Sequence, residues 1–271
     1  MKPDSNQPIG VFDSGVGGLT VAHAIAQLLP VEQLIYFGDT AHLPYGDKSQ
    51  QAIQQYSEKI SKFLLMKNCK AIVIACNTAS SFAFQHLDNL FGKKVPVINV
   101  IDPVVEYVCS EKSLKKIGVI GTKGTIQSGI YSKKILEKNK NLKVQSLATP
   151  LFAPMIEEGF VNNEISRTLI KEYLSKPAIE GIDSVILACT HYPLIKNEIE
   201  KFYDNKVKVI DSASIVAQYT KRILREKKLL KDKPSGNHQF YVSDYTPVFE
   251  QTANIFFGEK LHLEFYPIWN N

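Results

Sequence analysis

Two cysteines stand at the ends of near-matching apolar runs, and this duplication limits the possible folds more than any other feature. Residues 71–78 are AIVIACNT, and residues 184–191 are SVILACTH. Each run is rich in β-branched residues and ends in Ala-Cys before small polar residues, which is typical of a buried strand that leads into a loop. The sequence therefore predicts that Cys76 and Cys189 occupy equivalent positions in two similar units.

The internal repeat extends beyond the cysteines. The strand-like segment IGVF and a glycine-rich turn lie well before Cys76, and IGVI with a second glycine turn lies at a similar distance before Cys189. After each cysteine comes another apolar strand-like segment, at residues 95–99 and 207–211, which runs into an Asp and a helix-like stretch. Landmarks repeated in the same order indicate two copies of one unit in which strands alternate with helices.

This repeat predicts an α/β fold of two similar lobes, each a mostly parallel sheet flanked by helices and related by a pseudo-twofold axis. Apolar residues at three- and four-residue spacing predict helices at residues 19–29, 50–67, 128–138 and 163–174. Ligands of parallel sheets bind beyond the carboxyl ends of the strands, so we expect the active site in the cleft between the lobes. The alternative is two independent sheets whose cysteines never meet.

The C-terminal part of the chain is too short to form a core of its own. Its pattern predicts a helix at 214–227, a strand at 239–242, a helix at 247–256 and a strand at 261–265. We therefore expect it to pack on the first lobe. The predicted division is lobe one at 1–99 plus 212–271, which carries Cys76, and lobe two at 100–211, which carries Cys189.

Composition narrows the function classes. The net charge of +5 is weak evidence for nucleic acid, and we expect the basic run at 221–228 to be a solvated helix face. The chain shows no signal-peptide pattern and no apolar run of membrane-spanning length. Its four cysteines form no C-x-x-C pair and no zinc-like cluster, so we predict free thiols, no metal, and a reduced, cytoplasmic protein.

The residues after each cysteine suggest reactive thiols. Asn77 and Thr78 follow the first cysteine, and Thr190 and His191 follow the second. These residues favour helix N-caps, so we expect each thiol near the positive end of a helix dipole, which lowers a thiol pKa. Two such thiols on opposite sides of one carbon could remove a proton from one face and return one to the other. A buried cysteine that only packs is the alternative for each alone.

Two glycine-containing segments are candidate ligand contacts. The turn at residues 13–18 follows a strand and lacks the phosphate-loop ending, so its amides could hold a carboxylate. Asp13 within it could hold a ligand ammonium, support a thiol or cap the next helix. In the loop after the strand at 33–37, Tyr45 and Gly46 could cover a ligand with a hydroxyl and an amide. Glu157 is either an acidic supporting group or a solvated helix residue.

These motifs together resemble those of the glutamate racemases, within the cofactor-independent aspartate/glutamate racemase superfamily. The resemblance covers essentially the whole chain. It rests on the segments DSGVGGLT at 13–20, GDT at 38–40, PYG at 44–46, ACNTA at 75–79 and CTHYPL at 189–194. The cysteine motifs mark the superfamily, and the first and third segments narrow it to glutamate.

The resemblance implies an isomerase that interconverts L- and D-glutamate with no pyridoxal phosphate and no metal, for bacterial peptidoglycan. It implies that Cys76 takes the Cα proton from D-glutamate, that Cys189 takes it from L-glutamate, and that the other thiol reprotonates the opposite face. Asp13, Glu157 and His191 match residues that assist these thiols. The implied substrate contacts are Ser14, Tyr45, Gly46, Asn77, Thr78 and Thr190.

The chain departs from the family pattern at Ala188, where many members have Gly, and at Thr149, where many have a third cysteine. Neither position carries an implied catalytic role.

The implied partners are the small-molecule substrate, no nucleic acid and no membrane; the family often forms homodimers. Open alternatives are a racemase of aspartate or another acidic substrate, a non-catalytic binder of acidic amino acids, and a redox protein with a Cys76–Cys189 disulfide.

Overall fold

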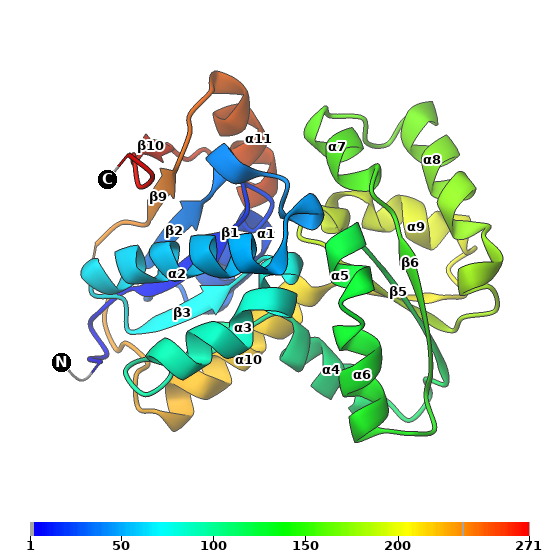
Figure 1. Cartoon of the computed structure of the whole chain (residues 1–271), viewed down its shortest axis with the longest axis horizontal. Helices are drawn as coiled ribbons and strands as arrows, with labels where there is room; N and C mark the ends of the chain where they lie inside the picture. Colours follow the sequence, from blue (N-terminus) through cyan, green and yellow to red (C-terminus); the bar gives the residue numbers. More distant parts are fainter. Residues whose placement is uncertain (1–2, 235, 271) are drawn as a thin grey trace.

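The strands form two separate parallel sheets in the computed structural model, which describes residues 3–234 and 236–270 (Figure 1). The six-stranded sheet has the order β10-β9-β2-β1-β3-β4, and the four-stranded sheet has the order β6-β5-β7-β8. The strands are β1 Ile9–Asp13, β2 Leu34–Gly38, β3 Ala71–Ile74, β4 Val97–Asn99, β5 Lys116–Gly121, β6 Lys143–Ala148, β7 Ser184–Ala188, β8 Lys208–Ile210, β9 Gln239–Val242 and β10 Glu264–Phe265.

The two sheets repeat one topology. The order β2-β1-β3-β4 of the first sheet matches the order β6-β5-β7-β8 of the second, and each of these neighbouring pairs is parallel. Cys76 follows β3 and Cys189 follows the equivalent strand β7. The predicted α/β class with two parallel sheets flanked by helices is therefore confirmed.

The C-terminal segment extends the first sheet. Strand β9 pairs in parallel with β2, and β10 pairs with β9, so these strands lie at one edge of the six-stranded sheet. The division of the chain at residues 99 and 211 into two lobes stays a prediction, since sheet membership describes strands and not folding units. No helix of the described residues is long and apolar enough to cross a membrane.

Helices cover the sheets and connect their parallel strands (Figure 1). The α-helices are α1 Leu19–Leu28, α2 Gln50–Met66, α3 Asn77–Phe91, α4 Ile101–Ser110, α5 Lys123–Gln127, α6 Ile130–Lys138, α7 Phe152–Glu157, α8 Glu164–Leu174, α9 Lys196–Phe202, α10 Ser212–Glu226 and α11 Pro247–Phe257. Short 3₁₀ helices are η1 Thr40–His42, η2 Tyr45–Asp47, η3 Pro177–Ile179 and η4 Tyr192–Ile195.

The predicted helices begin and end within two residues of the observed ones, and one predicted strand is shorter than expected. The helix expected at 128–138 begins at Ile130, because Gly129 has a φ of 63° and separates it from α5. The strand expected at 261–265 is only Glu264–Phe265. Local signals elsewhere are strong: Asn163 and Ser166 form a capping box at α8, and Thr246 caps α11, whose C-cap is Gly258 with a φ of 78°.

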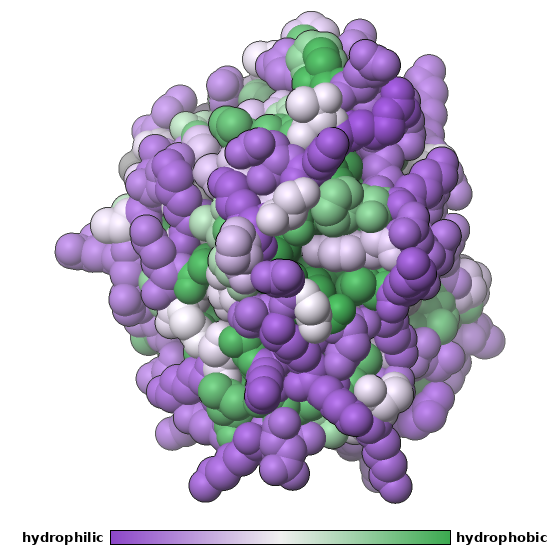
Figure 2. Space-filling model, turned by 90° about the vertical axis from the view of Figure 1, so that its right-hand side faces the viewer, coloured by the Kyte–Doolittle hydropathy of each residue, from purple (hydrophilic) through white to green (hydrophobic). Residues whose placement is uncertain are grey.

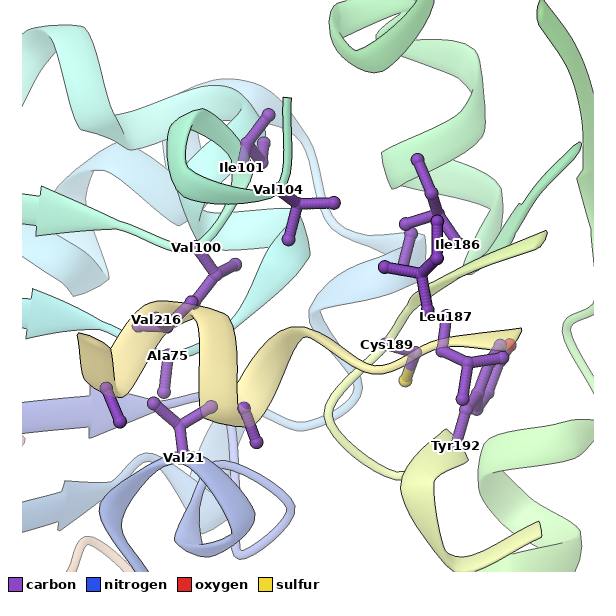
Figure 3. Packing of buried hydrophobic residues seen from close by; sticks show 14 of the residues in the cluster. Val21, Ala75, Val100, Ile101, Val104, Ile186, Leu187, Cys189, Tyr192 and Val216 are labelled. Atoms are coloured by element: carbon purple, nitrogen blue, oxygen red, sulfur yellow. The ribbon is translucent and has the colours of Figure 1, made fainter. Parts of the chain in front are cut away.

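Two buried hydrophobic clusters hold these layers together. The smaller one packs α2 and α3 on one face of the first sheet, with side chains such as Ile60, Phe63 and Leu87. The larger one begins on the α1 face and continues into the second sheet. Its members from the first sheet's side, such as Val104 and Val216, lie across from Ile186 of β7 (Figure 3). The core is thus continuous between the sheets on this side of the molecule.

The half of the molecule that contains the second sheet has an outer face exposed to solvent. Hydrophilic side chains cover most of that face, and hydrophobic ones lie between them (Figure 2). Strand β6, at the edge of its sheet, is only partly buried, unlike the fully buried β7. The chemistry-bearing side chains lie instead at the carboxyl ends of the central strands.

Candidate active site

A cavity of about 150 Å³ lies where the carboxyl ends of β1 and β3 face the end of β7. Segments that follow strands of both sheets line it, so the alternative of two independent sheets is wrong. Its lining consists of Ser14, Gly15, Leu43, Pro44, Tyr45, Gly46, Cys76, Asn77, Thr78, Thr122, Ala153, Pro154, Glu157, Ala188, Cys189, Thr190 and His191. Every predicted site residue except Asp13 is in this set.

Cys76 lies at the junction of β3 and α3. It is itself the N-cap of α3, and its Sγ accepts a hydrogen bond from the Ala79 N–H at 3.4 Å. The expectation that Asn77 or Thr78 caps this helix was therefore wrong, although the thiol does lie at the helix N-terminus. The thiol also donates to Ser14 Oγ at 3.7 Å.

The expected lowering of the Cys76 pKa was also wrong. Burial, and after it the nearby Asp13 carboxylate, raise this pKa to about 12, although the Ala79 N–H and Ser14 act in the opposite direction. Desolvation of the thiolate outweighs the helix terminus. Cys76 is therefore a neutral thiol at neutral pH, ready to donate a proton.

Asp13 lies behind the cavity wall and is fully buried. Its Oδ2 accepts from the Gly15 N–H at 3.1 Å, and its Oδ1 accepts from Thr190 Oγ1 at 3.4 Å. Burial raises the Asp13 pKa, whereas the nearby His191 and the amides of the glycine turn lower it. The carboxylate thus links the turn after β1 to the residues that follow Cys189.

Cys189 belongs to a chain of three side chains. Its Sγ lies 3.6 Å from His191 Nδ1, and His191 Nε2 lies 2.8 Å from Glu157 Oε1. Burial alone would lower the His191 pKa, but hydrogen bonds to Cys189 and Glu157 raise it well above its ordinary value. A protonated imidazole beside a cysteine stabilises the thiolate form. This cysteine is followed by the short helix η4 and not by an α-helix, so no helix dipole of the expected kind lies here.

Hydroxyl and amide groups form another part of the cavity wall. Thr78 Oγ1 lies 2.9 Å from Thr122 Oγ1 and 3.1 Å from Thr125 Oγ1, which joins the N-termini of α3 and α5. Asn77 accepts a hydrogen bond from the Tyr131 hydroxyl at 2.7 Å, whereas its buried Nδ2 has no partner among the described groups. Among the described residues that line the cavity there is no arginine.

Several lining residues were not predicted. Ala153 and Pro154 come from α7, four and three residues before Glu157, and that spacing on one helix face is a signal that could have found them. Leu43 and Pro44 directly precede Tyr45. Phe256 of α11 packs edge-on against the His191 ring at 5.1 Å between ring centroids. No local pattern signals a contact over such a sequence distance.

Comparison with known proteins agrees with this geometry. Residues 9–220 of the chain match a protein family described as Asp/Glu/hydantoin racemase. The chain belongs to this family. The resemblance drawn from the motifs is therefore confirmed, and the two departures at Ala188 and Thr149 do not disturb it; Thr149 is buried and its hydroxyl lies 2.7 Å from that of Tyr192.

Individual relatives are similar over nearly their whole length. A glutamate racemase of Geobacter metallireducens is 43% identical over 254 residues, with 93% of each chain covered. The crystal structure of a Francisella tularensis glutamate racemase in complex with D-glutamate has a TM-score of 0.91 at 42% identity, covering 98% of this chain and 100% of that one. A Thermus thermophilus glutamate racemase in complex with β-chloro-D-alanine has a TM-score of 0.87 at 37% identity, covering 97% and 98%.

Proposed function

We propose that this chain interconverts L- and D-glutamate by removing the Cα proton with one cysteine and returning a proton with the other. The observation that carries this proposal is the placement of Cys76 and Cys189 after equivalent strands on one cavity. A single base returns its proton to the face it came from, so inversion needs an acid already placed opposite. Two thiols on one small cavity meet that need.

The surroundings of the two thiols support complementary resting states. Cys76 is held as a neutral thiol by burial and by Asp13, which suits a proton donor. Cys189 lies beside a protonated His191, which suits a thiolate base. In this state the enzyme takes the Cα proton of L-glutamate with Cys189 and delivers a proton from Cys76. The reverse reaction uses the opposite protonation states.

The other side chains assist these steps in distinct ways. Glu157 keeps the imidazole of His191 protonated and oriented, and Asp13 gives a negative charge close to Cys76 that a substrate ammonium would offset. When the ammonium binds, its positive charge favours ionisation of Cys76 for the reverse direction. The Cα proton is a very weak acid, so preorganised donors in a site that excludes water must stabilise the developing carbanion.

The substrate carboxylates need donors, and the cavity wall offers them. We assign this binding to hydroxyls and amides, including the unpartnered Nδ2 of Asn77 and the hydroxyl of Thr78. An unsatisfied buried donor costs about 1–3 kcal/mol, so a ligand oxygen that pairs with it binds more tightly. The proposed contacts are Ser14, Tyr45, Gly46, Asn77, Thr78 and Thr190.

The proposed product, D-glutamate, would serve peptidoglycan synthesis, which sets cell shape. The proposed location is the cytoplasm, where thiols stay reduced; all four cysteines are free in the described structure. A homodimer is a further prediction, which analytical ultracentrifugation tests.

Racemisation is tested by circular dichroism of purified protein with L-glutamate, without added metal or pyridoxal phosphate. Loss of the signal at a rate proportional to enzyme concentration is expected. L-Aspartate is assayed in parallel, and a larger kcat/KM for aspartate than for glutamate would overturn the substrate assignment. Binding of glutamate with no loss of optical activity would favour the non-catalytic binder.

A further inference from the structure

The carboxylate of Asp39 is a buried hub beneath the cavity wall. Its Oδ2 accepts a hydrogen bond from the Tyr45 hydroxyl at 2.7 Å, and its Oδ1 accepts from Ser243 Oγ at 2.7 Å and from Trp269 Nε1 at 2.8 Å. His42 Nδ1 lies 3.0 Å from Oδ2. A carboxylate offers about four lone-pair sites, so these partners nearly saturate it.

One of these partners belongs to the wall of the cavity. Tyr45 is 1% exposed, and with Gly46 it lines the cavity above the hub. Its hydroxyl is used by Asp39, and burial followed by the charge of Asp39 raises the Tyr45 pKa well above its ordinary value, so the phenol stays protonated. The position of the substrate-facing segment at 43–46 therefore depends on where Asp39 is held.

The C-terminal segment supplies another of these partners. Trp269 follows β10, at the opposite end of the chain from Asp39. Its ring meets His42 edge-on at 4.5 Å and Tyr56 at 5.3 Å, and Lys59 Nζ lies 5.1 Å from its centroid. The indole is thus enclosed by rings and a cation while its N–H points at the carboxylate.

We propose that Trp269 is a positioning residue for the substrate cavity, acting through Asp39 on Tyr45 and Gly46. Its indole N–H fixes Oδ1, the same carboxylate holds the Tyr45 hydroxyl through Oδ2, and the segment beside Tyr45 lines the cavity. This inference rests on the proposed function for its kinetic readout. It assigns to the C-terminal segment a role in substrate affinity in addition to sheet formation.

Trp269→Phe is the decisive variant, because it keeps a ring in the aromatic enclosure and removes the N–H. We expect the KM for glutamate to rise about fivefold while kcat stays within about twofold, since charge-assisted hydrogen bonds are about twice as strong as neutral ones. A merely destabilised protein would lose active molecules, which lowers kcat and leaves KM unchanged. Tyr266→Phe is the matched control. Tyr266 lies in the same C-terminal segment as Trp269, but its ring packs on Phe63 and it is not a partner of the Asp39 hub.

Calorimetric titration with D-glutamate gives a second readout that does not require turnover. The dissociation constant should rise about fivefold in Trp269→Phe and stay unchanged in Tyr266→Phe. Trp269 is the single tryptophan of the sequence, so its emission in the wild type should also change as glutamate binds.

The outcomes separate this inference from the proposed function. An inactive wild type that binds D-glutamate would overturn racemisation, while the change in dissociation constant would still decide the positioning role. Unchanged KM and dissociation constant in folded Trp269→Phe would overturn the positioning role alone. If that variant does not fold, Ser243→Ala decides, since Ser243 donates to the same Oδ1; a normal dissociation constant in it would refute the hub.

Discussion

Gly17 of the turn after β1 faces the residues that follow Cys189, and adding one methyl group there should disable the site. A Cβ at Gly17 would lie 2.5 Å from His191 Cε1, 2.6 Å from His191 Nδ1 and 2.7 Å from Thr190 Oγ1. Carbon atoms in contact are normally about 3.5–4.0 Å apart, so the imidazole of Gly17→Ala protein must move by about 1 Å. Nδ1 is the atom that faces the Cys189 thiol.

The displacement should cost catalysis far more than stability. Overpacking of this kind destabilises by about 1–3 kcal/mol. A misplacement of about 1 Å can lower a rate by about 100-fold, which is the reduction in kcat/KM that we expect. The expected reduction in kcat/KM is the same for L-glutamate and D-glutamate as substrate, because the equilibrium constant of racemisation is one.

Circular dichroism kinetics on Gly17→Ala and on a matched variant, Gly118→Ala, test this reasoning. A Cβ at Gly118 of β5 would lie 2.7 Å from Ile182 Cδ1, the end of a flexible side chain away from the cavity. That variant should be less stable yet keep kcat/KM within about twofold, since overpacking at that site leaves His191 in place. Wild-type kcat/KM in folded Gly17→Ala protein would refute the claim that the position of His191 limits the reaction.

Two further predictions concern buried charges. Lys70→Met should destabilise the protein by about 3–5 kcal/mol, because it leaves the buried Glu32 carboxylate without the ammonium 2.5 Å away. Urea unfolding measures this loss, and the control Lys206→Met, in an exposed ion pair, should cost less than about 1 kcal/mol. Equal losses in the two variants would contradict the prediction. The second prediction is that kcat/KM falls on the alkaline side only well above the ordinary His pKa, because His191 must stay protonated and its pKa is raised. Glu157→Gln removes a carboxylate that raises this pKa, so the alkaline limb should move to lower pH; an unmoved limb would argue against the pair.

The sequence was sufficient to predict features that are encoded locally and repeated. Each strand that ends in Ala-Cys occurs in the chain as one continuous segment, and the equivalence of Cys76 and Cys189 followed from comparing two such segments. The glycine turn at 13–18 and the loop with Tyr45 lie at strand ends, where the cavity lies. Parallel topology brings such ends together, so the site could be expected at the cleft.

Features that depend on contacts between distant segments could not be predicted. The raised pKa of Cys76 comes from burial and from Asp13, whereas the local pattern suggested only a helix N-terminus. The ring contact of Phe256 with His191 and the hydrogen bond from Trp269 to Asp39 join residues far apart in the chain. Propensity and periodicity describe neighbours in sequence, so they carry no information on these pairs.

The central claim is that two thiols act on opposite faces of one carbon, and deuterium incorporation tests it most directly. The wild type is incubated with L-glutamate in D₂O, and deuterium at Cα is measured in the D product and in the recovered substrate at early times. Cys76→Ala, Cys189→Ala and the control Cys109→Ala are treated alike; Cys109 lies outside the cavity lining. The account predicts deuterium in the product well ahead of the substrate, no racemisation in the first two variants, and normal activity in the control. Equal early labelling of substrate and product in the wild type, or racemisation that persists in either variant, would contradict it.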